Sequence, residues 1–189
     1  CLNESTLLPP HLFSHRIARA SPKSSTYLFN NINEDSSWNQ TGGTGFIIDH
    51  ALSSHKITHG ADPTGLGRWS YIRLRGKHGS SISFFSAYRP CRSTTSMGSV
   101  WNQHFRHFQS AATPSPDPCS IFDRDLLAAV TGSLNAGDNV VIGIDNNADV
   151  RSSGLTTQFS ALGLKDAILS QHSYASPLLL ITGTPIGLP

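Results

Sequence analysis

The sequence of 189 residues has little charge, since Asp, Glu, Lys and Arg make up only 14% of it, against roughly a quarter of a typical domain. It contains no apolar run of about 18 residues, so we expect no transmembrane helix. It shows no basic segment followed by an apolar run, so we expect no signal peptide. Its three cysteines lack the spacing of a metal knuckle. Reduced thiols in an intracellular protein, with the nucleus as one candidate location, are the expectation.

Acidic residues are absent from the whole stretch between Pro63 and Pro116, which nevertheless holds seven lysines and arginines. If these side chains gather on one side of the domain, they form a positive face that attracts a phosphate backbone. The alternative is a set of ordinary solvated strand residues. On the first interpretation, the expected nucleic-acid contacts are Arg68, Arg73, Arg75, Arg89 and Arg92.

The pattern of apolar residues predicts strands followed by helices and a last strand. Strands are expected at residues 44–48, 56–58, 69–75 and 81–88, with residues 76–79 as a hairpin turn. A helix capped by Ser99 follows, and a second begins at Ser120, which forms a capping box with Asp123. The second helix should end near Gly132 or Gly137. Residues 140–144 form a continuous apolar run that predicts a strand buried on both faces, and residues 155–162 predict a short helix.

This alternation favours an α/β fold over an all-β one. We expect a single domain over residues 1–189, irregular at residues 5–41.

Two strand ends carry polar groups suited to chemistry. Asp145 and Asn147 follow the apolar run, and being two residues apart they can point the same way. Tyr88 ends another strand and could offer its hydroxyl to a phosphate, with Arg89 beside it. Each feature has a plainer alternative, because Asp-Asn-Asn is good turn chemistry and a tyrosine before Arg-Pro can simply reach the surface. Glu4, after a short apolar start, is weak by itself.

Taken in order, these features resemble one family. The sequence reads Asn3-Glu4-Ser5, then Gly42-Gly43-Thr44-Gly45, then Ser86-Ala87-Tyr88-Arg89-Pro90, then Asp145-Asn146-Asn147. This order resembles the endonuclease/exonuclease/phosphatase superfamily, which has the deoxyribonuclease-I-like fold. It is most similar to the endonuclease-like domain beside reverse transcriptases in retroelements. The resemblance covers roughly residues 1–170, and it is best over residues 42–170.

The resemblance implies an incomplete four-layer α/β sandwich with two mainly antiparallel or mixed sheets. It implies a phosphodiesterase that uses Mg²⁺, or Mn²⁺ in its place, with Glu4 as the metal ligand. Tyr88, Asp145 and Asn147 match the catalytic positions. The implied partner is nucleic acid, with DNA preferred to RNA, and no membrane partner is implied. In the intact parent protein, the resemblance implies a reverse-transcriptase domain downstream.

The sequence departs from the family at both ends. The family's first strand, with its polar Asn before the Glu, has no counterpart before Cys1, and Ile186 is not followed by the family's Asp and Ser-Asp-His. We therefore expect a truncated copy with little or no activity. A non-catalytic remnant that binds nucleic acid, and a small-molecule phosphoesterase of the same fold, remain alternatives.

Overall fold

A computed structural model describes residues 42–93, 98–111, 115–149, 154–167 and 170, together with the backbone of residues 26–30. Glu4 lies outside the described residues, as does most of the segment that we expected to be irregular. Within that segment, however, Thr26–Asn30 forms strand β1. The expectation of irregular structure was wrong there, because these residues pair antiparallel with a strand that follows them.

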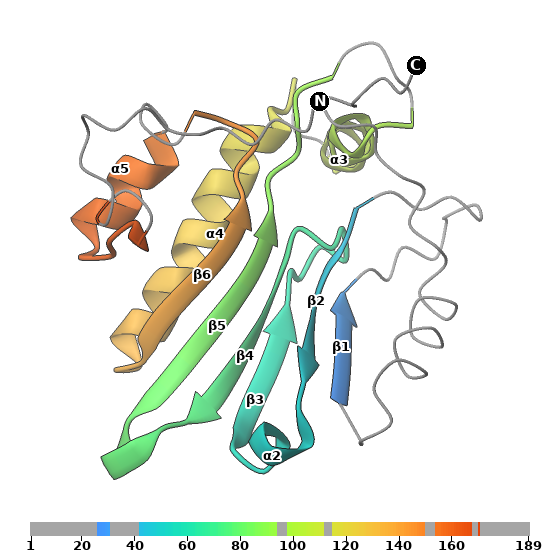
Figure 1. Ribbon diagram of the computed structural model, residues 1–189. Helices are drawn as coiled ribbons and strands as arrows, with labels where there is room; N and C mark the ends of the chain where they lie inside the picture. Colours follow the sequence, from blue (N-terminus) through green and yellow to red (C-terminus); the bar gives the residue numbers. More distant parts are fainter. Residues whose placement is uncertain are drawn as a thin grey trace, which may run out of the picture.

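The described chain combines two sheets with helices (Figure 1). The strands are β1, β2 (Thr44–Ile48), β3 (Lys56–Ala61), β4 (Trp69–Arg75), β5 (Ser81–Tyr88) and β6 (Asn139–Asp145). The helices are α2 (His50–Ser53), α3 (Val100–Ser110), α4 (Pro118–Asn135) and α5 (Gly154–Ala161), with a 3₁₀ turn at Lys77–Gly79. None of the helices in the described part of the chain is both long and apolar enough to cross a membrane.

The larger sheet has the order β3-β4-β5-β6. Strands β3, β4 and β5 form an antiparallel ribbon, with β4 and β5 joined at the predicted hairpin turn, and β6 returns through α3 and α4 to lie parallel to β5. The smaller sheet is the antiparallel pair β1-β2. The prediction of an α/β fold is therefore confirmed, with a mixed main sheet.

The main sheet packs on both faces, so the described residues form three layers. On one face Trp69 and Phe85 pack with Phe122, Leu126 and Val130 of α4, which are all completely buried. On the opposite face, a second cluster joins Ile48 of β2 to Ile72 and Leu74 of β4, with Ile82 and Phe84 of β5 beside them. Alternation along β4 and β5 therefore sends one set of side chains to the helices and the other to the small sheet.

Helix α4 begins earlier than predicted. Its N-cap is Asp117, whose carboxylate accepts hydrogen bonds from the backbone N–H of Cys119 at 3.3 Å and from the hydroxyl of Ser120 at 2.7 Å. Pro118 occupies the first helical position, where its missing N–H costs nothing. The capping box that we expected at Ser120 is therefore wrong. The helix ends at Asn135, just before Gly137, one of the two predicted terminators, which has a φ of 79°.

Strand β6 is not buried on both faces, contrary to our prediction. Its side chains alternate between half-buried and exposed, and Val141 keeps 47% of its surface exposed. Val140, Ile142 and Ile144 pack toward the helices. The β1-β2 pair packs over β4 and β5, and β6 forms the edge of the described sheet. An apolar run at an edge can thus be exposed on one face.

Candidate functional site

Tyr88 and Asp145 lie side by side at the ends of two parallel strands. They are register partners in the β5–β6 pair, and residues directly opposite one another share a face of the sheet. Their neighbours Ala87 and Ile144 pack toward the helices, so Tyr88 and Asp145 point to the other face. There Asp145 is exposed and Tyr88 is half-buried. The fold thus brings together two predicted site residues that are far apart in sequence.

Asn147 closes the same end of the sheet. Its side-chain Nδ2 donates to the backbone carbonyl of Arg89 at 2.8 Å, and the backbone N–H of Arg89 donates to the carbonyl of Asp145 at 2.9 Å. The backbone N–H of Asn147 also donates to Oδ1 of Asp145 at 3.4 Å, a long contact of the kind expected of an Asx turn. The turn interpretation and the clustering of Tyr88, Asp145 and Asn147 are therefore compatible.

The guanidinium of Arg89 is directed at helix α4. Its Nε and Nη2 donate to the two carboxylate oxygens of Asp123, at 2.7 and 2.9 Å. The side chains of both residues are mostly buried, with 17% and 21% of their surface exposed. These hydrogen bonds raise the pKa of Arg89 above its usual value, although burial opposes them. Sequence reasoning missed this partner, because Asp123 fitted a capping position.

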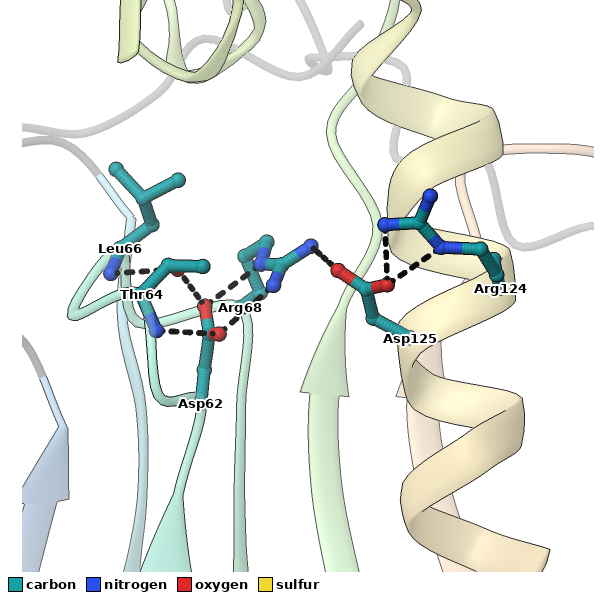
Figure 2. A network of polar contacts seen from close by, with 6 residues as sticks. All are labelled: Asp62, Thr64, Leu66, Arg68, Arg124 and Asp125. Atoms are coloured by element: carbon teal, nitrogen blue, oxygen red, sulfur yellow. Dashed lines mark hydrogen bonds and ion pairs between the residues drawn. The ribbon is translucent and has the colours of Figure 1, made fainter. Parts of the chain in front are cut away.

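Arg68 is buried, and Figure 2 shows its guanidinium between Asp62 and Asp125. It donates to Asp62 through Nε at 2.6 Å and Nη2 at 2.8 Å, and to Asp125 of α4 through Nη1 at 3.0 Å. Its guanidinium carbon also lies 4.5 Å from the ring centre of Trp69. Its backbone carbonyl accepts the N–H of Tyr88 at 2.9 Å. Arg68 therefore supports the Tyr88 strand end and does not belong to an exposed positive face.

Arg73 is likewise paired. It donates to the buried carboxylate of Asp138 at 2.7 Å through Nη2, and the hydroxyls of Ser81 and Ser83 donate to the same carboxylate. Burial alone would raise the pKa of Asp138, but the hydrogen bonds from Arg73 and the serines outweigh it and lower that pKa.

The expected positive face is therefore much reduced. Three of its arginines, Arg68, Arg73 and Arg89, bind aspartates that lie outside the acid-free stretch of sequence. The two others that we singled out, Arg75 and Arg92, are exposed. Arg92 follows Tyr88 by four residues, whereas Arg75 pairs with Ser81 at the far end of β5, roughly 23 Å away at the usual rise of a strand.

At the Tyr88–Asp145 end, the described residues offer a single carboxylate to a hard cation. Mg²⁺ prefers oxygen ligands and is usually held by one or two carboxylates together with water. Asp145 presents one exposed carboxylate there, and Glu4, the predicted metal ligand, lies outside the described residues. Within those residues, no group of three or more His, Cys, Asp or Glu side chains is placed to hold a metal.

No protein-family model, curated protein or solved structure matches this chain.

Proposed function

We propose that this chain is a metal-dependent phosphodiesterase domain that acts on nucleic acid, a retroelement-derived member of the endonuclease/exonuclease/phosphatase superfamily. The observation that carries the proposal is the adjacency of Tyr88 and Asp145 across parallel strands, with Asn147 bonded to the same strand end. Polar groups held at the end of a rigid sheet are where such sites are usually built. The full four-layer sandwich, with two larger sheets, is part of this proposal.

The residues at this end have complementary tasks. Asp145, whose side chain is exposed, would orient or deprotonate the attacking water. Tyr88 would donate its hydroxyl to a phosphate oxygen, and Asn147 would hold the phosphate in place. A bound Mg²⁺ or Mn²⁺ ion, with Glu4 as its protein ligand, would supply Lewis-acid stabilisation of the charge that develops on phosphate.

Nucleic acid is the preferred substrate because a basic side chain close to Tyr88 in the sequence is exposed. Arg92 comes four residues after Tyr88, and in this proposal it contacts a phosphate along the backbone from the reacting one. Arg75, also exposed, would contact the backbone only at the distant end of β5. In the intact parent protein, a reverse-transcriptase domain would follow.

The described residues of the candidate site, Tyr88, Asp145 and Asn147, include no histidine. General acid–base catalysis by such a group contributes roughly 10²–10⁴-fold, so we expect slow catalysis.

The test is nicking of supercoiled plasmid with excess protein and Mn²⁺, comparing the wild type with Asp145→Asn. The matched control is Asp149→Asn, which removes another exposed carboxylate from the same loop. We expect weak nicking that is lost in Asp145→Asn and kept in Asp149→Asn.

A second measurement does not need turnover. Mn²⁺ should broaden the NMR signals of Asp145 and Asn147 before those of Asp138, which is buried at the other end of β6. Nicking that persists unchanged in Asp145→Asn, or broadening that is no stronger at Asp145 than at Asp138, would contradict the proposal. DNA binding without either effect would instead support the non-catalytic alternative.

A further inference from the structure

Arg89 connects three separate parts of the site through three different groups. Its backbone N–H donates to the carbonyl of Asp145 at 2.9 Å. Its backbone carbonyl accepts the side-chain amide of Asn147 at 2.8 Å. Its guanidinium holds both carboxylate oxygens of Asp123 on α4, at 2.7 and 2.9 Å. One residue therefore ties the end of β6, and the turn after it, to a helix on the far face of the sheet.

The part of α4 that carries Asp123 is held in place by packing and by a second contact. Phe122, next to Asp123 in α4, is completely buried. The thiol of Cys119, one turn earlier, donates to the carbonyl of Pro90 at 3.3 Å. The segment that follows Tyr88 is thus held against α4 twice, once by a charged pair and once by a thiol. A displacement of this segment would carry Asp145 and Asn147 with it.

We infer that Arg89 is a positioning residue, which acts through its pair with Asp123 to fix Asp145 and Asn147 relative to Tyr88, and that it is not the phosphate contact expected from the sequence. The inference rests on the proposed function for what the positioned groups do. Its geometric part, the dependence of the Asn147 contact on the Arg89–Asp123 pair, does not.

The contacts of the guanidinium favour this role over phosphate binding. The planar fork of Arg89 already bonds both oxygens of a carboxylate, the arrangement that is stronger than single hydrogen bonds between neutral groups. A phosphate would have to displace Asp123 from a pair whose two side chains are only 17% and 21% exposed. The hydrogen bonds to Asp123 are also the largest cause of the raised pKa of Arg89. Arg92, by contrast, is exposed.

Three variants separate the two roles: Arg89→Lys, Arg89→Gln and Asp123→Asn. Lysine keeps the charge but cannot form the two-pronged fork. The readout is hydrogen exchange, measured by NMR without metal or nucleic acid, at the side-chain amide of Asn147 and the backbone N–H of Arg89. For a positioning residue, all three variants should speed exchange at both groups by about tenfold or more, as expected of a local opening. Lysine should not restore protection.

A matched control uses a second arginine–aspartate pair, at the opposite end of the sheet. Arg73→Lys disturbs the pair with Asp138 at the opposite end of β6 and should leave exchange at Asn147 unchanged. The backbone amides of Leu126 and Val130, in the core of α4, report whether each variant is folded. Two kinds of substitution, at Arg89 and at Asp123, keep the test decisive if one variant fails to fold.

Affinity for a short labelled DNA duplex, measured in EDTA over a salt series, tests the rival role. A positioning Arg89 predicts that Arg89→Gln changes affinity by less than about twofold and leaves the salt dependence as it was. A phosphate contact predicts that the slope of log affinity against log salt falls by about one, with rescue by lysine. That second pattern, or unchanged exchange at Asn147 in all three variants, would overturn the inference.

These outcomes remain distinct from failure of the proposed function. The exchange measurement requires neither metal nor substrate, whereas the proposed function fails on Asp145-dependent nicking and on Mn²⁺ broadening. Where nicking is measurable, Arg89→Lys should lower kcat by about tenfold or more and change KM by less than about twofold, since misplaced catalytic groups slow the reaction without weakening binding.

Discussion

Arg68 and Asp62 form a two-pronged ion pair with no exposed side-chain surface, at 2.6 and 2.8 Å. Burial alone would raise the pKa of Asp62, but the hydrogen bonds and charge of Arg68 outweigh it and hold that pKa below its usual value. Because Arg68 also bonds Asp125 of α4 and its carbonyl holds Tyr88, this pair links stability to the geometry of the candidate site.

We predict that Arg68→Met lowers the free energy of unfolding by about 3–5 kcal/mol, because it leaves Asp62 buried without a counter-charge. Arg68→Met combined with Asp62→Leu should recover part of that loss, since it removes both charges. Arg124→Ala is the control: this arginine also contacts Asp125, but its side chain is 73% exposed, so about 0–1 kcal/mol is expected. Urea denaturation measures all three. Equal losses for Arg68→Met and Arg124→Ala would show that burial of the pair does not matter.

His104 predicts a dependence of stability on pH. Burial is the largest cause that lowers its pKa, to about 4, and the positive charge of Arg68 adds to it, with His107 contributing and Asp62 opposing. A histidine with a lowered pKa binds its proton more readily in the unfolded chain. The contribution of neutral His104 to the free energy of unfolding is therefore fully present above about pH 6.5. It is lost as the pH falls toward about 4, by up to about 3 kcal/mol.

Denaturation midpoints between pH 7 and pH 4 test this expectation. His104→Leu should flatten the profile in that window, whereas His107→Ala, at an exposed position, should leave its slope nearly as it was. The aspartates with lowered pKa values, Asp62, Asp117 and Asp138, lose their contribution at lower pH, below about 4, so the two effects separate. An unchanged slope in His104→Leu would rule out this histidine as the cause.

Local features of the fold were predictable from neighbouring residues. The strands at Trp69–Arg75 and Ser81–Tyr88 alternate cleanly, and Ser99 caps α3 by accepting the N–H of Asn102. These signals operate over a few residues, where hydrogen bonds and alternation of side chains decide the structure. The same reasoning failed at Ser120, because Asp117 before a proline makes a stronger helix start than a capping box further on.

The partners of the arginines and the burial of β6 could not be predicted from neighbouring residues, because they depend on contacts between distant parts of the chain. Arg73 meets Asp138 and Arg89 meets Asp123, although the sequence between each arginine and its partner carries no sign of the pairing. The exposed face of Val141 follows from the edge position of β6, which an apolar run cannot reveal. The adjacency of Tyr88 and Asp145 was expected only through the family resemblance, since alternation within each strand does not specify which strands pair.

Strand β3 has no room for a side chain at Gly60. A Cβ atom at this position would lie 2.5 Å from Cε1 and 2.8 Å from Cζ of Tyr71, whose ring stacks on Phe85 with centres 5.4 Å apart. Gly60→Ala should therefore destabilise the protein by roughly 1–3 kcal/mol, as overpacking usually does. Gly132→Ala is the opposite case, because its Cβ meets nothing within 4 Å in α4, and it should stabilise by about 1 kcal/mol. Thermal unfolding of both variants checks the pair, and a stable Gly60→Ala would show that Tyr71 can move aside.

Asn147 combines a left-handed backbone with a side-chain hydrogen bond, and three substitutions separate these contributions. Its φ is 45°, a region that Asn and Gly tolerate and most other residues do not. Asn147→Gly keeps the backbone and loses only the bond to the Arg89 carbonyl, so a loss of about 1 kcal/mol is expected. Asn147→Ala should cost about 1–2 kcal/mol more, because its Cβ is strained there. Asn147→Asp keeps the backbone tolerance but sets a carboxylate against the carbonyl of Arg89.

Denaturant unfolding should therefore rank Asn147→Gly as milder than Asn147→Ala. Ser115→Gly is a matched control, because Ser115 also has a positive φ, of 50°, and is exposed. It should be neutral or slightly stabilising, since glycine relieves the strain. If Asn147→Gly and Asn147→Ala prove equal, the left-handed turn after β6 is not present in solution. The contact between Asn147 and Arg89, on which the site geometry depends, would then also have to be abandoned.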